Sequence, residues 1–244
     1  STFLNWITHR TMSDTQCPAD SIPPITDTEV DPAMVRERAY SIWKRYGNQD
    51  ETANYFLAEK ELRMEPRLKE VFRFLDNTDR GVCTFGQLLA FGDFIGVEWT
   101  LLYLRESFNL FEATESSIVN LTQFLRFTVD ELNGLDLQLF NYVIEGYITY
   151  TGFDYRIKEE LQNCFTSMPS YKLCTVSISD FLYLIDYLAP EKDRAYHLRI
   201  LSGVDTTRDG YISRYEFFTL LALLLPNSIT VSELTRRMQM YINK

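Results

Sequence analysis

Apolar residues recur in one register around four polar stretches of this sequence. The stretches begin at Asp76, Glu112, Pro169 and Asp205, so their starts lie 36, 57 and 36 residues apart. The shared apolar positions lie four residues and one residue before the start, at the eighth position, directly after the stretch, and three residues later. In chain order they are Phe72, Leu75, Cys83, Leu88 and Phe91; Phe108, Phe111, Val119, Phe124 and Phe127; Phe165, Met168, Val176, Phe181 and Leu184; and Leu201, Val204, Ile212, Phe217 and Leu220. This repeat predicts four helix–loop–helix units in two pairs.

The fourth stretch, DTTRDGYISRYE, carries oxygen-bearing side chains at positions that point inward when a loop curls around one ion. These are Asp205, Thr207 and Asp209 at the first, third and fifth positions, Ser213 at the ninth and Glu216 at the twelfth. Gly210 stands sixth, where a sharp turn needs a residue that tolerates unusual backbone angles. The stretch resembles the EF-hand calcium loop closely.

The resemblance implies both a fold and a site. The fold is all-α, with two lobes of paired EF-hands, short β-ribbons between the loops, and additional helices at the two ends. The site is one Ca²⁺ ion, with Mg²⁺ possible at rest, held by Asp205, Thr207, Asp209, the Tyr211 carbonyl, Ser213 and Glu216. In the family, the twelfth residue binds the ion through both carboxylate oxygens, and the apolar eighth residue joins the two loops of a pair.

The other three stretches keep the apolar frame and lose the ligands. The first loop (76–87) has Arg80 at the fifth position, where a guanidinium about 5 Å from a divalent ion would cost several kcal/mol even at an effective dielectric of about 20. The unfavourable or missing ligands are Arg80 and Gln87 in the first loop, Ser117 and Gln123 in the second (112–123), and Pro169, Lys172 and Leu173 in the third (169–180). We expect these three loops to be structural, without an ion.

The N-terminal part of the chain precedes these units. Residues 1–30 are rich in proline and predict an irregular arm, which carries the apolar residues Phe3, Leu4, Trp6 and Ile7. This arm either packs back on its own domain or anchors in another protein. Residues 31–64 predict two helices. The first begins at Asp31-Pro32 and has Val35, Ala39, Ile42 and Trp43 on one face, and the second runs from about Asp50 to Met64.

Four segments follow in the predicted organisation. The first pair of units occupies 65–134, an apolar connecting helix 135–154, the second pair 155–225, and a C-terminal helix 226–244. A capping box from Thr230 to Glu233 begins that helix, and Val231, Leu234, Met238 and Tyr241 share one face of it. It either packs simply against the second lobe or occupies the groove in which that lobe would bind a target helix.

Composition narrows the class of partner. The chain has 244 residues, 45% of them hydrophobic, and a formal net charge of −10. This charge argues against nucleic acid or an anionic membrane and favours a basic peptide or helix, although it also serves solubility. No apolar run is long enough for a membrane span. Cys17, Cys83, Cys164 and Cys174 form no zinc-like cluster, so we expect reduced thiols and a cytoplasmic location, possibly cytoskeletal or axonemal, with a mitochondrial one as the alternative.

An enzyme is the least favoured class of function. His9 and His197 are the only histidines, and no nucleophile motif or phosphate-binding glycine loop is present. Two non-catalytic hypotheses are left open. In one, the chain is a scaffold or regulatory subunit that holds an amphipathic or basic helix within a larger complex. In the other, it is a calcium sensor whose second lobe opens to bind such a helix, with Phe217, Leu220 and Leu221 in its groove.

Overall fold

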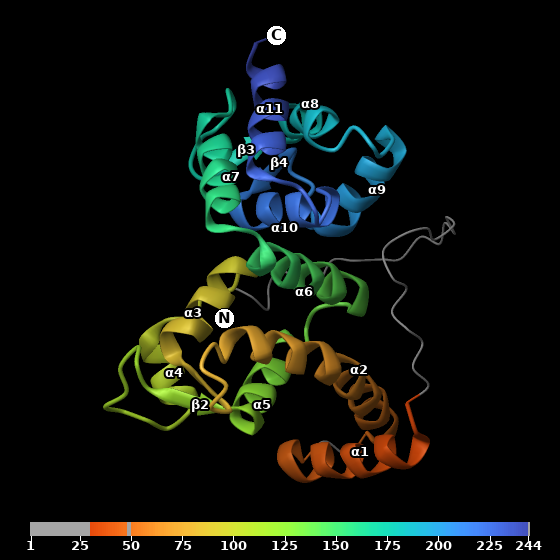
Figure 1. The fold of residues 1–244 in the computed structure, drawn as a ribbon. Helices are drawn as coiled ribbons and strands as arrows, with labels where there is room; N and C mark the ends of the chain where they lie inside the picture. The colour runs from red at the N-terminus through yellow and green to blue at the C-terminus, as the bar shows by residue number, and fades with distance from the viewer. Residues whose placement is uncertain (1–29, 48–49, 244) are drawn as a thin grey trace. The chain divides into compact units, whose positions relative to one another are not determined.

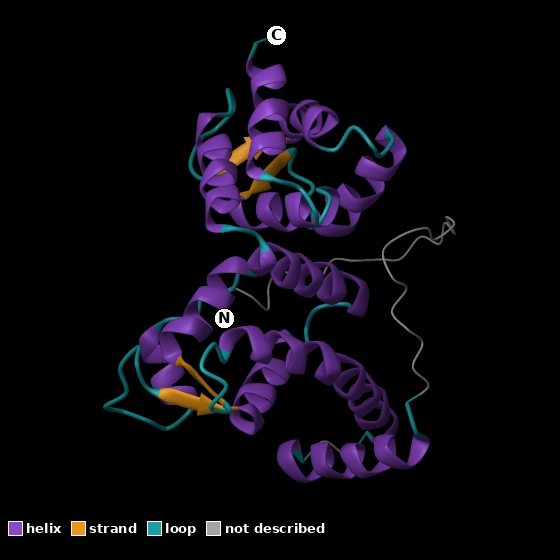
Figure 2. Cartoon of the chain, in the orientation of Figure 1, coloured by secondary structure: helices purple, strands orange, loops and turns teal. Residues whose placement is uncertain are grey.

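The computed structural model describes residues 30–47 and 50–243. These residues form eleven helices and four strands of three residues each (Figures 1 and 2). In chain order they are α1 Pro32–Tyr46, α2 Glu51–Leu75, β1 Val82–Thr84, α3 Phe85–Phe94, α4 Leu101–Ser107, β2 Ile118–Asn120, α5 Leu121–Leu132, α6 Leu137–Gly152, α7 Tyr155–Ser167, β3 Thr175–Ser177, α8 Ile178–Leu188, α9 Arg194–Val204, β4 Tyr211–Ser213, α10 Arg214–Leu224 and α11 Val231–Ile242. The predicted all-α class with short strand pairs is confirmed. The predicted N-terminal arm, residues 1–30, lies outside the described part except for its last residue.

The four strands form two antiparallel pairs, β1 with β2 and β3 with β4 (Figure 2). The central residues of each pair lie opposite one another: Cys83 faces Val119, and Val176 faces Ile212. All four side chains are buried. These are the eighth positions of the four loops, so the pairing expected at those positions is observed in both pairs.

The chain forms two compact units. The first contains the described residues up to Glu70 together with Leu121–Asn141, and the second contains Val71–Asn120 and the residues from Tyr142 onward. Both strand pairs belong to the second unit. The division between the units passes through α2 and α6. The predicted domain boundary at 64/65 also lies within α2, and those at 134/135, 154/155 and 225/226 lie between helices. The predicted domains stay a prediction. Among the described residues, no helix combines the length and the apolar character that crossing a membrane requires.

The predicted end of the second helix near Met64 is wrong. Helix α2 continues through Pro66 to Leu75, the last residue before the first loop. Proline inside a helix removes one backbone hydrogen bond and costs about 3 kcal/mol. Met64, Leu68 and Val71 are fully buried on either side of it. Their burial offsets that cost, so the helix does not stop.

The apolar frame is buried at all but two positions, both in the second helix–loop–helix unit. Phe111 is 74% exposed, and Phe108 is half-buried. Helix α4 ends early because Asn109 adopts a left-handed conformation, with φ of 54°. The Leu110 N–H then bonds to the Arg105 carbonyl at 2.8 Å, which is the hydrogen bond of a helix-terminating Schellman motif. The expectation that Phe111 lies in the core is therefore wrong.

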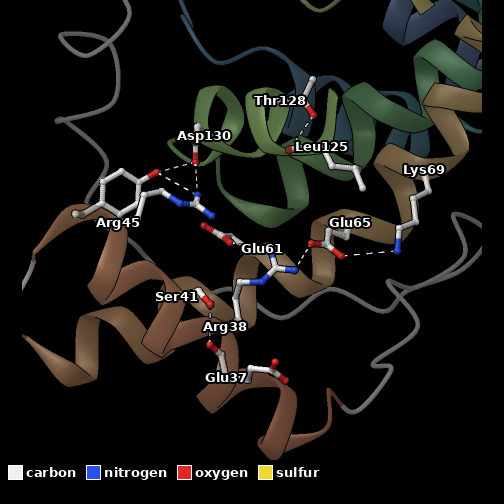
Figure 3. A network of polar contacts seen from close by, with 11 residues as sticks. Glu37, Arg38, Ser41, Arg45, Glu61, Glu65, Lys69, Leu125, Thr128 and Asp130 are labelled. Atoms are coloured by element: carbon white, nitrogen blue, oxygen red, sulfur yellow. Dashed lines mark hydrogen bonds and ion pairs between the residues drawn. The ribbon is translucent and has the colours of Figure 1, made fainter. Parts of the chain in front are cut away.

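Helix α1 is joined to α2 by an apolar contact and by a partly buried ion pair. The Arg38 Nη1 donates to Glu61 Oε2 at 3.0 Å, and its Nη2 donates to Glu65 (Figure 3). The Glu61 side chain is only 2% exposed. Burial raises the pKa of Glu61, and Arg38 opposes the rise by favouring the charged form. The apolar contact consists of the buried Val35, Ile42 and Ala58.

The C-terminal helix α11 packs against α7 and α8 within the second unit. Leu234 is fully buried, and Arg237 is 8% exposed. Arg237 donates to the Leu188 carbonyl at 2.6 Å and forms ion pairs with Glu191 and Glu233. The predicted start at Thr230 is confirmed, since its hydroxyl caps the Glu233 N–H. The Glu233 side chain, however, pairs with arginines and not with the N-cap backbone, so only half of the predicted capping box is present.

Replacing Arg38 by Met should lower the free energy of unfolding by about 2 kcal/mol. The loss arises because Glu61 is left buried without its ion-pair partner, and it is moderated because Arg38 is itself partly exposed. Urea unfolding measures the effect. Arg36→Met, an exposed change on the same helix, should cost less than about 0.5 kcal/mol. Adding Glu61→Leu to Arg38→Met should restore part of the loss, and equal effects of Arg36→Met and Arg38→Met would contradict this account.

The stabilisation contributed by Glu233 should depend on pH. Hydrogen bonds from Arg236 and then Arg237 lower the pKa of Glu233 from 4.5 to about 2. Because the folded pKa is below the ordinary value, the stabilisation is complete above pH 4.5 and is lost as the pH falls towards 2. The difference in unfolding free energy between wild type and Glu233→Gln, measured from pH 6 to pH 2, should therefore shrink on acidification. A difference that stays constant with pH would count against these ion pairs.

Candidate metal centre in the fourth loop

The fourth loop, Asp205–Glu216, connects α9 to α10 and contains β4. Asp205 caps the end of α9, and its Oδ1 accepts the Arg208 N–H at 2.9 Å and the Thr207 hydroxyl at 3.3 Å. Gly210 has φ of 88°, a left-handed conformation that glycine adopts without steric cost. The sequence therefore forms the turn locally, and the strand pair β3–β4 fixes the exit of the loop.

Glu216 lies inside the loop and not on the solvent side of α10. Its side chain is among the buried charged groups, at 1% exposure, and Asp205 is also buried, at 6%. Glu216 Oε2 accepts the Ser213 N–H at 2.9 Å and the Ser213 hydroxyl at 2.6 Å, and Oε1 accepts the Thr206 N–H at 3.4 Å. Burial raises the pKa of Glu216, the Ser213 hydrogen bonds oppose the rise, and the Asp205 charge adds to it. The first and last residues of the loop are thus two buried carboxylates that lie close enough for their negative charges to interact.

The remaining predicted ligands lie nearer the surface. Asp209 is exposed, and its Oδ1 accepts the Tyr211 N–H at 2.9 Å. The Tyr211 side chain is 49% exposed, which leaves its backbone as the part that belongs to the loop. Among the described residues, no three acidic, histidine or cysteine side chains are gathered closely enough to share a metal ion. Asp205 and Glu216 lie close enough for the Asp205 charge to act on Glu216, and the three carboxylates of the loop do not form one cluster.

The donor chemistry of the loop fits a hard cation. All six predicted ligands offer oxygen, which Ca²⁺ and Mg²⁺ prefer over nitrogen and sulfur. Two of the carboxylates are buried, and a buried negative charge is costly unless a positive charge compensates it. A third carboxylate, Asp209, accepts one hydrogen bond from the Tyr211 N–H, and a carboxylate has enough lone pairs to keep that bond and also bind an ion.

The first loop keeps the turn of the fourth but satisfies its carboxylate internally. Asp76 Oδ2 accepts the Gly81 N–H at 2.6 Å, and Oδ1 accepts the Arg80 N–H at 3.0 Å and the Thr78 hydroxyl at 3.3 Å. Asp79 and Gly81 are both left-handed. Asp205 accepts comparable bonds in the fourth loop, so the two loops differ at the fifth and twelfth positions, where the first loop has Arg80 and Gln87 in place of carboxylates.

The second and third loops are also closed by hydrogen bonds of the protein itself. In the second, the Thr114 N–H donates to the Ser117 hydroxyl at 2.9 Å. In the third, the Ser177 N–H donates to the Ser170 hydroxyl at 2.8 Å, and Lys172 and Thr175 exchange backbone hydrogen bonds of 3.0 Å. In these two loops, which lack ion ligands, neutral hydroxyl groups thus accept backbone hydrogen bonds that hold the loop together.

The polar residues most often used in catalysis have structural partners here. His197 is buried, with Nδ1 3.3 Å from Asp186 Oδ1 and Nε2 3.2 Å from the Ala189 carbonyl oxygen. Burial raises the pKa of Cys83 and of Cys164 to about 12, so both are thiols at neutral pH. His9 lies outside the described residues.

A groove in the first unit was not predicted from the sequence. It has a volume of about 830 Å³ and lies between α1 and the start of α2. Trp43, predicted on one face of the first helix with Val35, Ala39 and Ile42, is 44% exposed and lines this groove. The lining residues are Arg36, Ala39, Tyr40, Trp43, Glu51, Thr52, Asn54, Tyr55 and Phe56. The aromatic residues at helical spacing on the two predicted helices were the signal that could have indicated it.

Comparison with models of protein families, with curated proteins and with solved structures found no match for this chain. The resemblance of the fourth loop to an EF-hand calcium loop therefore rests on the residues and geometry of this chain alone.

Replacing Ile212 by Ala should destabilise the second pair of loops. Ile212 is fully buried opposite Val176, and removing three carbon atoms from such a site costs about 3 kcal/mol. Tyr211→Ala, in the same strand but with a half-exposed side chain, should cost less than about 1 kcal/mol. Chemical denaturation of the two variants makes the comparison. Similar losses for both would show that the strand pair does not bury Ile212 as described.

Proposed function

We propose that this chain is a non-catalytic EF-hand protein that binds one calcium ion in the loop Asp205–Glu216 and acts as a scaffold or regulatory subunit of a larger protein assembly. One observation carries the proposal. The eighth residue of this loop, Ile212, pairs with Val176 of the neighbouring loop, while the first and twelfth residues are buried carboxylates at the two ends of the same loop.

The residues of the loop would supply three kinds of oxygen ligand: carboxylates, hydroxyls and one backbone carbonyl. Asp205 and Glu216 would supply buried negative charge, and the ion would compensate that charge. Asp209 would bring a third carboxylate from the surface side. The hydroxyls of Thr207 and Ser213 and the carbonyl of Tyr211 would add neutral oxygen. A set of three carboxylates with neutral oxygens suits calcium, which accepts six to eight oxygen ligands in flexible geometry.

Two observations favour a constitutive role over that of a sensor. Internal hydrogen bonds close the first three loops, so these parts of the fold hold together without an ion. Helix α11 already covers α7 and α8, and Arg237 fastens it there by a hydrogen bond to the Leu188 carbonyl. A surface occupied in this way is not free for a partner, so the ion would brace the second pair of units. In the sensor alternative, α11 would have to dissociate from α7 and α8 before a target helix could bind there.

The proposed partner is a protein segment, an amphipathic or basic helix within the assembly. The net charge of −10 supports a basic partner through long-range attraction. Neither nucleic acid nor an anionic membrane surface has complementary charge.

Calcium should raise the thermal stability of the wild-type chain and leave that of Glu216→Gln unchanged. The physical reason is mass action, since an ion that binds only the folded state at 100 times its dissociation constant adds about 2.7 kcal/mol. The measurement is thermal unfolding during a calcium titration of chelator-treated protein, with an apolar-surface dye present. The matched control is Asp76→Asn, which alters the carboxylate at the same position of the first loop and should respond to calcium as the wild type does.

The dye distinguishes the two roles of the ion. A bracing ion leaves dye binding unchanged, whereas a sensor exposes more apolar surface when calcium binds. If Glu216→Gln and wild type respond identically to calcium, the site in the fourth loop is wrong.

A further inference from the structure

Tyr215 connects the fourth loop to a distant part of the chain within the second unit. It lies in the first turn of α10, beside Glu216, and its hydroxyl is 3.4 Å from Glu216 Oε1, to which it donates. Its ring lies against Gly96, in the turn after α3. A Cβ atom added at Gly96 would be 2.7 Å from Tyr215 Cδ1 and 2.8 Å from Cε1 and Cγ. One side chain thus touches both a predicted calcium ligand and a backbone segment more than one hundred residues away.

The turn at Gly96 is a well-defined support for the ring. Gly96 has φ of 77°, and it ends α3 in a Schellman motif. The Val97 N–H donates to the Gly92 carbonyl at 2.8 Å, and the Gly96 N–H donates to the Asp93 carbonyl at 3.3 Å. Both the conformation and the closeness of the ring require glycine. The position of Tyr215 is therefore set by backbone geometry and not by a flexible side chain.

The residue before Tyr215 contacts the same turn. Arg214 Nη1 is 3.3 Å from Asp93 Oδ2, and its Nη2 donates to Gln162 at 3.3 Å. The two side chains of the ion pair are 50% and 74% exposed, so the pair contributes little stability. It nevertheless places the start of α10 in contact with the end of α3 at a second point.

We propose that Tyr215 is a positioning residue for the calcium loop: its ring, supported by Gly96, holds its hydroxyl against Glu216, so that the turn after α3 sets the calcium affinity of the fourth loop. This inference rests on the function proposed above. Binding free energies are reciprocal, so calcium in turn strengthens the contact between Tyr215 and Gly96. The fourth loop is thereby coupled, through its eleventh residue, to a turn that lies outside the first two loops.

A purely structural role for Tyr215 makes a different prediction. A residue that only packs lowers the stability of the folded chain and leaves the ion affinity of that folded chain unchanged. A positioning residue changes the calcium affinity itself. Calorimetric calcium titration of folded protein, together with urea unfolding in chelator, measures the two quantities separately.

Four variants and one control form the test. Tyr215→Phe removes the hydroxyl and should weaken calcium binding about threefold, the effect of one modest hydrogen bond. Gly96→Ala displaces the ring and should weaken binding by about tenfold. In a Tyr215→Ala background, Gly96→Ala should have no further effect on affinity, because the ring that it displaces is gone. The control is Leu88→Val, which removes volume from a fully buried residue of α3 outside this turn. It should lower stability and leave calcium affinity within twofold of wild type.

The outcomes separate this inference from the proposed function. The inference is supported if the wild type binds calcium, Tyr215→Phe and Gly96→Ala bind it more weakly, and Leu88→Val binds it as the wild type does. If the wild type binds calcium and Tyr215→Phe and Gly96→Ala bind it with the same affinity, the inference is overturned and the proposed function is not. Absence of calcium binding by the wild type overturns the proposed function, and the inference with it.

Discussion

The pairing of loops through their eighth residues is the interaction on which the rest of the second unit depends. A three-residue strand is too short to be stable by itself, and its central side chain needs a partner to be buried. Val176 opposite Ile212, and Cys83 opposite Val119, meet this need. Because the flanking helices begin and end at fixed distances from these strands, their aromatic residues converge on the same core. Phe165 and Phe217, for example, lie with ring centroids 4.8 Å apart.

This constraint explains how the ligands of three loops can be absent while the fold remains. Strand pairing and helix packing hold each loop at both ends, and the loop then needs only a local turn between them. In the first loop, backbone N–H groups satisfy Asp76; in the third, the Ser170 hydroxyl closes the turn. In the fourth loop, Glu216 serves the fold by accepting two hydrogen bonds from Ser213, and its burial beside Asp205 gives the same residue a reason to bind a cation.

Much of this architecture could be predicted from the sequence because the apolar frame is periodic and local. The helices, the strand pairs and the burial of Asp205 and Glu216 follow from positions counted along the chain. The failures have tertiary or local causes that a pattern does not contain. Pro66 does not end α2 because buried residues on both sides hold the helix, and Phe111 is exposed because Asn109 ends α4 early. The contact of Tyr215 with Gly96 joins segments that nothing in the sequence links.

The central claim is that one of four similar loops holds an ion, and the number of calcium ions bound per chain tests it most directly. Equilibrium dialysis of the chelator-treated 244-residue chain against radioactive calcium gives this number without reference to stability or to any variant. The account predicts one ion per chain. A value of zero would contradict the site at Asp205–Glu216, and a value of two or more would contradict the expectation that the other three loops hold no ion.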